Sequence, residues 1–549
     1  MRKAANTVMN APVLSPVLAD GIKQEELLPF LLNANSYPHR PKSVRLIQTH
    51  ASFVFIVPPF VYKVKKAVDF GFLNFSTLDK RRHFCAREVE LNSRLCPTMY
   101  LGVVPISITE HGYRFGEGER VVEYAVKMRK LSERHFLDKI LRRRVLEPDK
   151  LDRIVGTLTE FYLRQHPNPK ITEWGQVDRL KISTDENFRQ TEEFVGRTLS
   201  AEAFETLKFF TDEFYTHGQQ LFEWRVNQDW IRDCHGDLHL EHIHITPKAL
   251  NIYDCIEFND RFRYIDVAND AAFLAMDLDY EHQPALGQRF IAAIASTLND
   301  SGIHQVIDFY KCYRAYVRGK VESLHSIAHA AADSERSASA ARARRYFRLA
   351  LQYAVAGSRP LVLAVRGRIG SGKTTLARAL DGELGWEVIS SDRVRKEMAG
   401  FPLFERSSEA ARSRLYSAAM TAKTYAKLLA EADERVRSGC SVILDATFAR
   451  REQRQQLIEH FEHTGAALWL VETQADDAAI KERLRAREAK PDEISDARLE
   501  DYDMLNAIYE PAAELPARHC VAITTTGPNA LLNTLKWLAG MQVKSQCLL

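Results

Sequence analysis

The chain has 549 residues, of which 45% are hydrophobic and 27% are charged, and its formal net charge is +3. This length is too great for one hydrophobic core, so several domains are expected, and the composition is that of an ordinary soluble globular protein. The small net charge excludes the polybasic bias of a dedicated nucleic-acid binder, although nucleic acid stays open as a partner of the C-terminal half.

The cysteines and the N-terminal residues indicate the cellular compartment of the protein. The eight cysteines are scattered without CxxC pairs, which favours reduced thiols in a cytosolic protein. The residues after Arg2 and Lys3 lack the apolar core of a signal peptide, and no stretch approaches about 18 apolar residues. We therefore expect a cytoplasmic protein with no membrane partner.

The first half of the chain mixes short strands with long helices. Residues 1–40 have mixed polarity and are expected to form an N-terminal tail with one short helix. A first domain is expected over residues 41–350. In it we expect strands within 43–66 and at 121–128, a helix at 81–95, mostly helices over 131–230, a second β region around 243–253, and helices from 266 to about 353.

The densest polar cluster of this domain lies between Cys234 and His244, where four histidines and two carboxylates occur within ten residues. Such a loop could ligate zinc, as histidine-rich loops do in metallohydrolases. Alternatively, Asp237 could be the base of a phosphoryl-transfer loop, with a metal ligand five residues later at His242.

Residues outside this loop favour phosphoryl transfer. Asp254 ends a β-like run 17 residues after Asp237, where a kinase-type site places its main Mg²⁺ ligand. Upstream, Lys63 lies on a strand and Glu88 lies on the next helix, 25 residues later, which suits a lysine–glutamate bridge that orients ATP phosphates. Lys65 shares the strand face of Lys63 by alternation, and the Val-Tyr-Lys pattern favours Lys63 as the ATP lysine.

With these motifs in order, residues 43–330 resemble the aminoglycoside phosphotransferase and choline-kinase branch of the protein-kinase-like fold. The resemblance rests on the His-Gly-Asp-Leu-His loop around Asp237, the metal aspartate Asp254, and the segment 265–268. It implies a bilobal α+β domain that binds ATP and Mg²⁺ and phosphorylates a hydroxyl. It also implies that Asp266 hydrogen-bonds the catalytic loop.

The chain departs from that family at His242, which stands where the family has a second metal-binding asparagine. Imidazole is a poorer Mg²⁺ ligand than an amide oxygen, because hard cations prefer oxygen. The domain could therefore use one metal, use a bridging water, or bind nucleotide with weak catalysis. Glu257 is open as a further acidic ligand or as a salt-bridge partner of Arg261 or Arg263. The acidic run 277–281 is the candidate for a pocket that takes cationic drugs.

The chain breaks at residues 357–360, Gly-Ser-Arg-Pro, after a stretch rich in Ala, Ser and Arg. We therefore expect a second domain over residues 358–549. In it, apolar strands alternate with helices, which indicates an α/β domain with a parallel sheet and helices on both faces. The expected strands are 361–365, 387–390, 441–444, 468–471 and 521–524.

A glycine-rich run follows the first of these strands and precedes a helix, which is the context of a phosphate-binding loop, or Walker A motif. Glycines let several backbone N–H groups point at one phosphate at the positive end of a helix. Lys373 can then reach the terminal phosphates of ATP, and the hydroxyl of Thr374 can hold Mg²⁺. The expected nucleotide-binding residues are Gly367, Gly370, Ser371, Gly372, Lys373, Thr374 and Thr375.

Two further strand ends carry candidate catalytic groups. Asp392 lies just beyond the strand that ends at Ser390 and can accept a proton from a substrate hydroxyl. Arg395 follows it on the first turn of a helix and can hold an anionic group of that substrate. Asp445 ends the strand 441–444 and suits a Mg²⁺ contact or a substrate contact.

Arg483 and Arg487 share one face of an expected helix over residues 480–487. Arginines on a mobile lid can neutralise the charge that builds on a transferring phosphoryl group. The alternative is a surface helix whose arginines are solvated.

These motifs cover residues 361 to about 515 and resemble the P-loop kinases that include phage-type polynucleotide kinases, zeta toxins, and gluconate or chloramphenicol kinases. The resemblance implies that Asp392 is the base and Arg395 the holder of a substrate phosphate in a hydroxyl kinase. The whole chain resembles a bacterial two-domain family commonly labelled bifunctional aminoglycoside phosphotransferase/ATP-binding protein. Fold alone does not determine the acceptor.

We therefore expect an ATP- and Mg²⁺-dependent kinase with two nucleotide sites that phosphorylates hydroxyls of small molecules. In one alternative, only the P-loop domain turns over and the first domain is a ligand or nucleotide sensor. In another alternative, the P-loop domain is a regulatory ATPase.

Overall fold

The structure is a computed structural model that describes residues 23–143, 146–328, 332–488, 494–512, 515 and 519–547. Residues 1–22 of the expected tail lie outside this range. The chain divides into two compact units. The first unit comprises Met1–Thr198 and Gly218–Phe347, and the second comprises Leu199–His217 and Arg348–Leu549.

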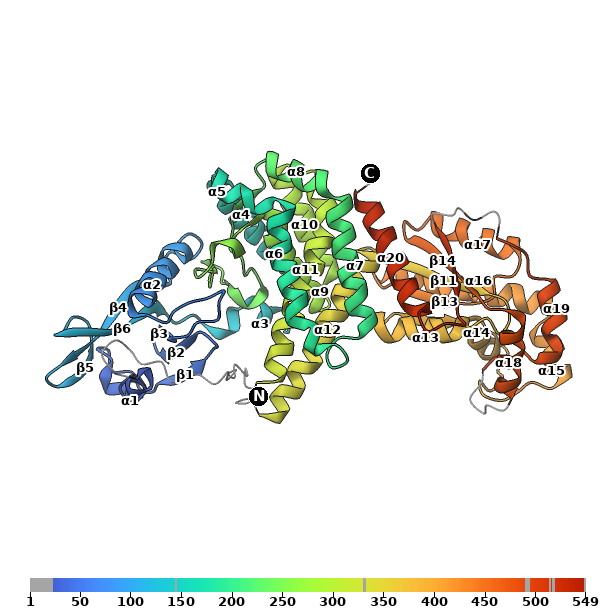
Figure 1. Cartoon of the computed structure of the whole chain (residues 1–549), viewed down its shortest axis with the longest axis horizontal. Coiled ribbons are helices and arrows are strands. Elements are labelled where there is room, and N and C mark those ends of the chain that lie inside the picture. The colour runs from blue at the N-terminus through green and yellow to red at the C-terminus, as the bar shows by residue number, and fades with distance from the viewer. Residues whose placement is uncertain are drawn as a thin grey trace. The chain divides into compact units, whose positions relative to one another are not determined.

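The first unit contains an antiparallel sheet with the strand order β1-β2-β3-β6-β4-β5 (Figure 1). The runs predicted within 43–66 and at 121–128 form β1, β2, β3 and β6. The strands β4 and β5 are additional to the prediction. The sheet consists of β1 (Arg45–Gln48), β2 (Ser52–Val57), β3 (Phe60–Lys65), β4 (Tyr100–Thr109), β5 (Gly112–Phe115) and β6 (Arg120–Arg129), and helix α2 (Leu78–Asn92) packs on β4 and β6.

The described part of the expected N-terminal tail packs against this sheet. It forms a 3₁₀ turn (Gln24–Leu27) and the short helix α1 (Leu28–Leu32). Leu27, Leu31 and Tyr37 are buried in the same apolar cluster as the inward-facing side chains of β2 and β3. These residues therefore belong to the core of the first unit, because their apolar side chains cover one face of its sheet.

The remainder of the first unit is mainly helical, as its periodicity predicts. Two short antiparallel pairs interrupt the helices: β7 (Ile231–Asp233) with β10 (Tyr264–Asp266), and β8 (Ile243–Ile245) with β9 (Leu250–Ile252). The helices are α3 (Leu137–Leu141), α4 (Pro148–Arg164), α5 (Pro169–Thr172), α6 (Val177–Thr191), α8 (Gln219–Asn227), α9 (Val267–Tyr280), α10 (Pro284–Leu298), α11 (Ile303–Ser326) and the part of α12 (Asp333–Ala356) up to Phe347.

The second unit is built on a parallel sheet with the strand order β12-β13-β11-β14-β15. This confirms the predicted parallel sheet, and each predicted run forms a strand. The strands are β11 (Leu361–Gly367), β12 (Glu387–Ser390), β13 (Val442–Asp445), β14 (Ala467–Gln474) and β15 (Cys520–Thr524). The helices are α13 (Lys373–Leu384), α14 (Ser391–Met398), α15 (Glu409–Leu415), α16 (Ala418–Arg437), α17 (Arg451–Glu462), α18 (Asp477–Glu488), α19 (Tyr502–Ala507) and α20 (Ala530–Cys547).

Helix α7 (Ala201–His217) clusters with the second unit, although its position in the chain lies within the expected first domain. It packs along α20, where Leu535 and Leu538 are fully buried. Lys536 lies 3.6 Å from Glu205 across this contact. The second unit therefore recruits a helix from far upstream, because the apolar side of α20 needs a partner to leave water.

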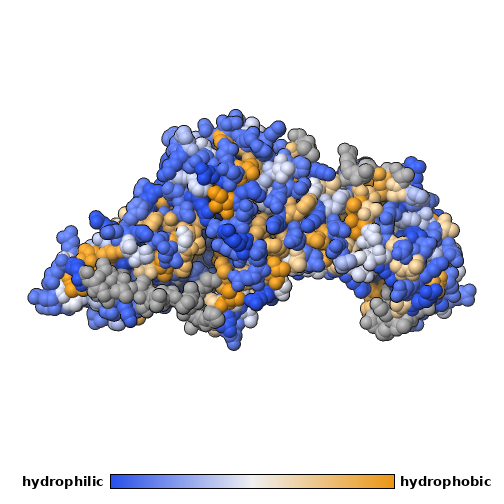
Figure 2. Space-filling view, in the orientation of Figure 1, coloured by the Kyte–Doolittle hydropathy of each residue, from blue (hydrophilic) through white to orange (hydrophobic). Residues whose placement is uncertain are grey.

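Most of the face seen in Figure 2 is hydrophilic, with smaller hydrophobic patches between. None of the helices in the described part of the chain is both long and apolar enough to cross a membrane.

Candidate functional site

Two predicted carboxylates of the first unit meet around one predicted lysine. Lys63, on β3, places its Nζ 2.9 Å from Oε1 of Glu88 and 2.8 Å from Oδ1 of Asp254. Glu88 lies on α2 and is fully buried, whereas Asp254 follows β9 and is partly exposed. The structure thus brings together side chains from three segments that are far apart in the sequence.

The neighbouring Lys65 shares Glu88 with Lys63. Its Nζ lies 2.7 Å from Oε2 of Glu88, and it also pairs with Glu257. The side chain of Lys65 is only 1% exposed, compared with 16% for Lys63. Lys63 is therefore the lysine that a ligand can reach, and Lys65 holds Glu88 and Glu257 in place.

The observed ion-pair partner of Glu257 is neither Arg261 nor Arg263, so the salt-bridge alternative for this residue is wrong. Glu257 pairs with Lys65, while Arg261 pairs with Glu186 and Arg263 pairs with Asp233. The sequence analysis did not identify Lys65 as the partner of Glu257, because Lys65 lies on β3 and only the tertiary structure brings that strand to Glu257.

The loop that carries Asp237 is anchored by an aspartate that the sequence analysis missed. Asp270, on α9, accepts hydrogen bonds from the backbone N–H of His235 at 3.0 Å and of Gly236 at 2.8 Å. Asp266, expected in this role, instead pairs with Arg225 and caps α9 through the N–H of Ala268. The expectation for Asp266 is therefore corrected.

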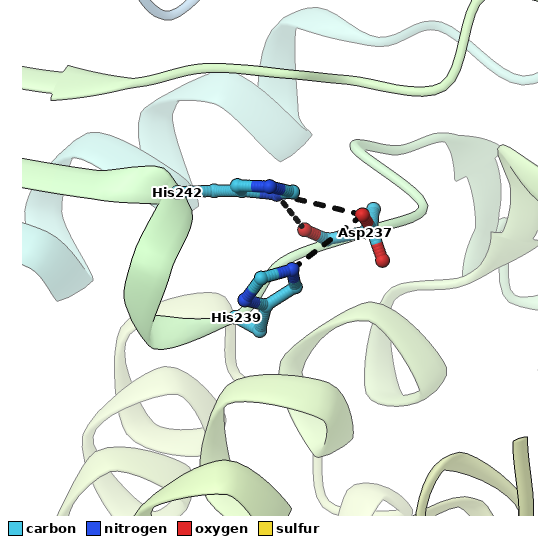
Figure 3. Close-up of side chains that lie close together, drawn as sticks. All are labelled: Asp237, His239 and His242. Carbon is cyan, nitrogen blue, oxygen red and sulfur yellow. Dashed lines mark hydrogen bonds and ion pairs between the residues drawn. The ribbon is translucent and has the colours of Figure 1, made fainter. Parts of the chain in front are cut away.

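Asp237, His239 and His242 form a compact cluster at the end of this loop (Figure 3). Oδ2 of Asp237 lies 3.6 Å from Nε2 of His239 and 3.5 Å from Nδ1 of His242. The two imidazole rings are 3.8 Å apart between centroids. One carboxylate thus faces two imidazoles whose planes are tilted by 38°.

His242 also faces Asp254, so it lies between the two aspartates. Its Nδ1 is 2.9 Å from the backbone oxygen of Asp237, and its Nε2 is 3.5 Å from Oδ2 of Asp254. A carbonyl oxygen can only accept, so Nδ1 carries the proton and Nε2 presents a lone pair toward Asp254.

Burial and charge oppose each other in this cluster. Burial raises the pKa of the Asp237 carboxyl, but His239 and His242 outweigh it and hold that pKa well below its usual range. Burial lowers the pKa of His239, yet the Asp237 carboxylate prevails and raises it above the ordinary value. For His242, burial and then the charge of His239 lower the pKa. Near neutral pH, Asp237 is a carboxylate and His242 is neutral.

Asp254 is held in its charged form by its neighbours. Burial raises the pKa of its carboxyl, but Lys63 and His242 prevail and bring that pKa below the ordinary value. Its backbone is left-handed, with φ at +62°, which is uncommon for a residue with a side chain and is typical of functional positions.

In the second unit, the predicted phosphate loop joins β11 to α13 with the expected backbone. Gly370 and Gly372 have φ of +69° and +95°, values that other residues rarely adopt. Nζ of Lys373 donates to the backbone oxygen of Arg368 at 3.0 Å, which folds the lysine back over the loop. Thr375, also predicted, is exposed at the start of α13.

The parallel sheet brings Asp445 to this loop. Val365 of β11 is in register with Asp445 of β13, and Oγ1 of Thr374 donates to Oδ2 of Asp445 at 2.7 Å. Burial lowers the pKa of Lys373 against the opposing charge of Asp445. Burial likewise raises the pKa of Asp445, which Lys373 and Thr374 oppose.

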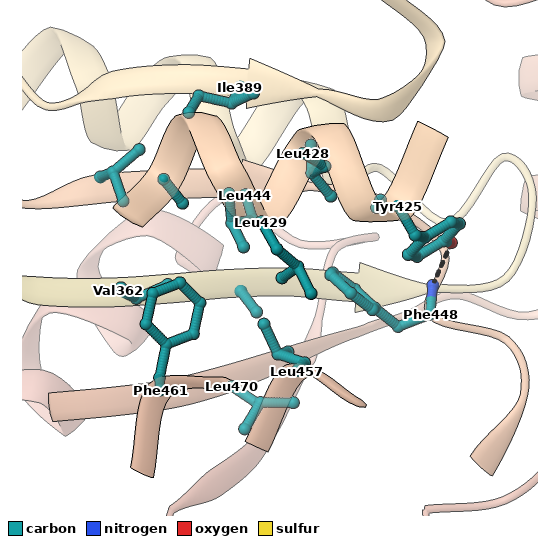
Figure 4. Close-up of a cluster of buried hydrophobic side chains, with 14 of the residues drawn as sticks. Val362, Ile389, Tyr425, Leu428, Leu429, Leu444, Phe448, Leu457, Phe461 and Leu470 are labelled. Atoms are coloured by element: carbon teal, nitrogen blue, oxygen red, sulfur yellow. Dashed lines mark hydrogen bonds between the residues drawn. The ribbon is translucent and has the colours of Figure 1, made fainter. Parts of the chain in front are cut away.

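An apolar core keeps these strand ends in position (Figure 4). Leu428 and Leu429 of α16 and Leu457 and Phe461 of α17 pack against one face of the sheet. The phenol of Tyr425 accepts the backbone N–H of Phe448 at 3.2 Å, just beyond the end of β13. The core therefore continues directly into the residues around Asp445.

Asp392 and Arg395 lie together on α14, beside Tyr416. The phenol of Tyr416 donates to Oδ1 of Asp392 at 3.4 Å, and the guanidinium of Arg395 lies 4.4 Å from the centre of the Tyr416 ring. Arg395 is buried, and its Nε and Nη1 have no hydrogen-bond partner among the residues that the structure describes. A buried cation with unused donors is suited to an anionic ligand.

The two predicted lid arginines occupy different positions relative to the loop. Arg483, on α18, donates to the backbone oxygens of Gly370 at 3.4 Å and of Thr525 at 2.7 Å. Arg487 lies one turn later and adds to the lowering of the Lys373 pKa, after burial. Arg483 therefore contacts the phosphate loop directly, whereas Arg487 acts on Lys373 through its charge.

Two threonines that the sequence analysis missed fasten the loop. Thr473 shares a hydrogen bond of 2.6 Å with Oγ of Ser371, and Oγ1 of Thr525 donates to the backbone oxygen of Ser371 at 2.6 Å. Both lie at the carboxyl ends of parallel strands, which is where such sheets gather ligand-binding residues. Their position at the ends of predicted strands is the sequence signal that could have identified these two threonines.

Comparisons with known proteins support part of this picture. The AAA domain family matches residues 362–512. An uncharacterized protein of Mycobacterium tuberculosis, Rv2004c, is 32% identical over 407 residues, which cover 74% of this chain and 79% of that protein. The uncharacterized protein Mb2027c of Mycobacterium bovis matches to the same extent. This chain belongs to their family.

Solved structures resemble part of the chain at lower identity. A gluconokinase from Sinorhizobium meliloti is 19% identical, with 34% of this chain and 93% of that chain covered and a TM-score of 0.22. Kti12 from Chaetomium thermophilum, in complex with ADP-AlF3, is 20% identical, with 32% and 95% covered and a TM-score of 0.25. At such scores these likenesses carry no functional argument.

Proposed function

We propose that the second unit is an ATP-dependent kinase that phosphorylates a hydroxyl of a small molecule. The observation that carries this proposal is the hydrogen bond between Thr374 and Asp445 beside Lys373, at the ends of two parallel strands. A hydroxyl and a carboxylate offer the oxygen ligands that Mg²⁺ prefers. The lysine supplies the positive charge that terminal phosphates need.

The acceptor side of the proposed reaction lies on α14. Asp392 takes the proton of the acceptor hydroxyl as general base, and the donors of Arg395 pair with an anionic group on the acceptor. Arg483 and Arg487 neutralise the charge that builds during transfer. Two nitrogens of the buried Arg395 guanidinium lack a hydrogen-bond partner among the described residues, which supports an acceptor that itself carries a phosphate or a carboxylate.

ATP with Mg²⁺ supplies the γ-phosphoryl group. The acceptor oxygen forms a bond to the γ-phosphorus, the bond from that phosphorus to the bridging oxygen of ADP breaks, and the hydroxyl proton passes to Asp392. Glycines at 370 and 372 let the backbone approach the phosphates closely.

For the first unit we propose a second ATP site of the protein-kinase-like type. Lys63 and Glu88 would orient the phosphates, Asp254 and His242 would face the metal, and Asp237 would be the base. The pairing of Lys63 with both Glu88 and Asp254 supports this proposal.

The acidic run that was considered for cationic acceptors is engaged elsewhere in the first unit. Oδ2 of Asp277 accepts the backbone N–H of Leu240 at 2.9 Å, and Asp279 pairs with Lys311 at 2.9 Å. This arrangement does not favour a drug-like polycation as the acceptor, because such a ligand needs clustered carboxylates that are not already paired.

The test is transfer of labelled γ-phosphate from ATP to a set of small hydroxyl compounds, with and without an anionic group. We expect Asp392→Asn to lose transfer in the second unit while ATP binding survives, and Lys373→Ala to lose both. A regulatory ATPase would instead release phosphate without an acceptor. Such release would require Lys373 and would be unchanged in Asp392→Asn, and this result would contradict the kinase role.

The same assay separates the alternatives for the first unit. If that unit is also a kinase, Asp237→Asn removes one product and leaves the product of the second unit unchanged. If Asp237→Asn removes no product while ATP still protects Lys63 from chemical labelling, the first unit is a nucleotide sensor.

A further inference from the structure

The environment of His242 determines which of its nitrogens is available to a ligand. The Nδ1–H donates to the backbone oxygen of Asp237 at 2.9 Å. This hydrogen bond fixes the ring and leaves the lone pair of Nε2 directed toward Asp254. A backbone carbonyl behind one imidazole nitrogen is the usual support of a metal-binding histidine.

Asp254 presents one carboxylate oxygen, Oδ2, on the same side. Its Oδ1 is 2.8 Å from Nζ of Lys63, while its Oδ2 is 3.5 Å from Nε2 of His242. Two ligands that each lie about 2.1 Å from a metal ion in tetrahedral geometry are about 3.4 Å apart. The observed spacing therefore fits two ligands of a single ion.

The chemistry of this pair argues against Mg²⁺. Mg²⁺ takes oxygen ligands and keeps strict octahedral geometry, so an imidazole nitrogen is a poor substitute for the amide oxygen expected at position 242. Imidazole suits the divalent ions of the first transition series, which bind nitrogen more strongly in the order from Mn²⁺ to Cu²⁺.

We propose that His242 Nε2 and Asp254 Oδ2 bind a divalent transition-metal ion in preference to Mg²⁺. The site of the first unit is then selective for a different metal from the phosphate loop of the second unit, where a hydroxyl and a carboxylate suit Mg²⁺. This inference rests on the proposed nucleotide site for its location. Metal binding is measured without nucleotide or acceptor. The inference about the metal therefore does not depend on whether phosphoryl transfer is detected.

Asp237 and His239 give a second arrangement that the test must separate. With His242 they form a group whose ligand atoms lie within 4.8 Å of one another (Figure 3). A metal held there by Nδ1 of His242 would break the hydrogen bond from that nitrogen to the backbone of Asp237. The assigned pair keeps that hydrogen bond, which is why we favour it.

The experiment titrates Mn²⁺ into the metal-stripped full chain and follows free Mn²⁺ by electron paramagnetic resonance, with Mg²⁺ as competitor. We expect one Mn²⁺ site that a hundredfold excess of Mg²⁺ does not empty. His242→Asn should weaken Mn²⁺ binding roughly tenfold or more and let Mg²⁺ compete on similar terms. Asp254→Asn should also weaken binding.

Two control variants locate the ion. His239→Asn and Asp445→Asn should both retain the Mn²⁺ site, the latter because it alters only the phosphate loop. Retained Mn²⁺ affinity in His242→Asn would overturn the proposal. Loss of binding in His239→Asn, with retention in Asp254→Asn, would overturn it in favour of the Asp237 cluster. Circular dichroism of each variant shows whether a loss reflects unfolding.

Discussion

At the scale of single residues, Arg395 is a position where burial and charge oppose each other. Its guanidinium is buried, it lies against the ring of Tyr416, and two of its nitrogens have no hydrogen-bond partner in the described part of the chain. Leaving a buried charge uncompensated costs several kcal/mol, on the order of the penalty for breaking a buried ion pair. A bound anion relieves that cost, which is a physical reason for an anionic acceptor.

We therefore predict that Arg395→Gln lowers kcat/KM for an anionic acceptor by roughly 10- to 100-fold, the value of one or two charge-assisted hydrogen bonds. Steady-state kinetics would show a smaller effect on an uncharged analogue and an unchanged KM for ATP. Arg393→Gln is the matched control, because Arg393 pairs with Glu397 and Glu431 on the surface of the same region. Equal losses in both variants would argue against a role for Arg395 in acceptor binding.

A second residue-scale prediction concerns the pKa of His239. Asp237 raises this pKa against the effect of burial. The pair therefore stabilises the fold fully below the ordinary histidine pKa of about 6.5, and this contribution is lost as pH rises through the raised value. In Asp237→Asn, burial and Arg318 lower the pKa of His239 and outweigh Asp277, which raises it, so the pKa should fall below the ordinary value. NMR titration of the imidazole C–H signals without added metal measures it. An unchanged pKa would mean that Asp237 is not the cause.

At the scale of elements, one glycine decides whether the Asp237 loop can form. Gly236 has φ at +85°, and a Cβ there would meet the backbone oxygen of Phe262 at 2.6 Å. Gly156, by contrast, is exposed on α4 with nothing within 4 Å of an added Cβ. The two glycines thus differ in backbone conformation and in space.

We predict that Gly236→Ala lowers the free energy of unfolding by more than about 1 kcal/mol, since it adds strain and a clash with backbone. Gly156→Ala should instead raise it by about 0.5–1 kcal/mol, as alanine favours a helix interior. Urea titration compares the two. If Gly236→Ala is as stable as the wild type, the loop does not need its left-handed glycine.

At the scale of the whole molecule, α7 changes how the chain should be divided. Residues 199–217 cluster with the second unit, so a cut at the expected boundary separates α20 from its partner helix. The helical pattern of α7 was readable in the sequence, but its partner was not, because periodicity shows only that a helix has an apolar side and not which surface covers it.

We predict that a fragment of residues 348–549 melts at a lower temperature than the second unit of the full chain, roughly 5 °C or more, since about 1 kcal/mol shifts Tm by about 2–4 °C at this size. A synthetic peptide of residues 199–217, added in trans, should recover part of the loss. Scanning calorimetry measures both. An unchanged Tm without the peptide would show that α7 adds nothing to the second unit.

The proposal of one nucleotide site in each unit makes a prediction about stoichiometry. Equilibrium dialysis with ATP should give one nucleotide for each unit, with Lys63→Ala removing one site and Lys373→Ala the other. Lys208→Ala, on exposed surface of α7, is a control that should retain both. A single site that Lys373→Ala abolishes would leave the first unit without a nucleotide role.

Local patterns in the sequence determined much of this protein. The strand–glycine–helix order around Lys373, the acidic ends of strands at Asp392 and Asp445, and the alternation in β1, β2 and β3 all follow from neighbours in the chain. Backbone geometry and hydrophobic periodicity act over a few residues, so a sequence alone displays them.

Only the tertiary structure determined which residues and helices contact one another. It brought Lys65 to Glu257, it brought Asp270 to the backbone of the Asp237 loop, and it placed His242 between two aspartates. It also placed α7 beside α20. Each of these contacts links segments whose approach depends on how whole layers pack, and the free energy of that packing is shared among many side chains. No short stretch of the sequence carries that information.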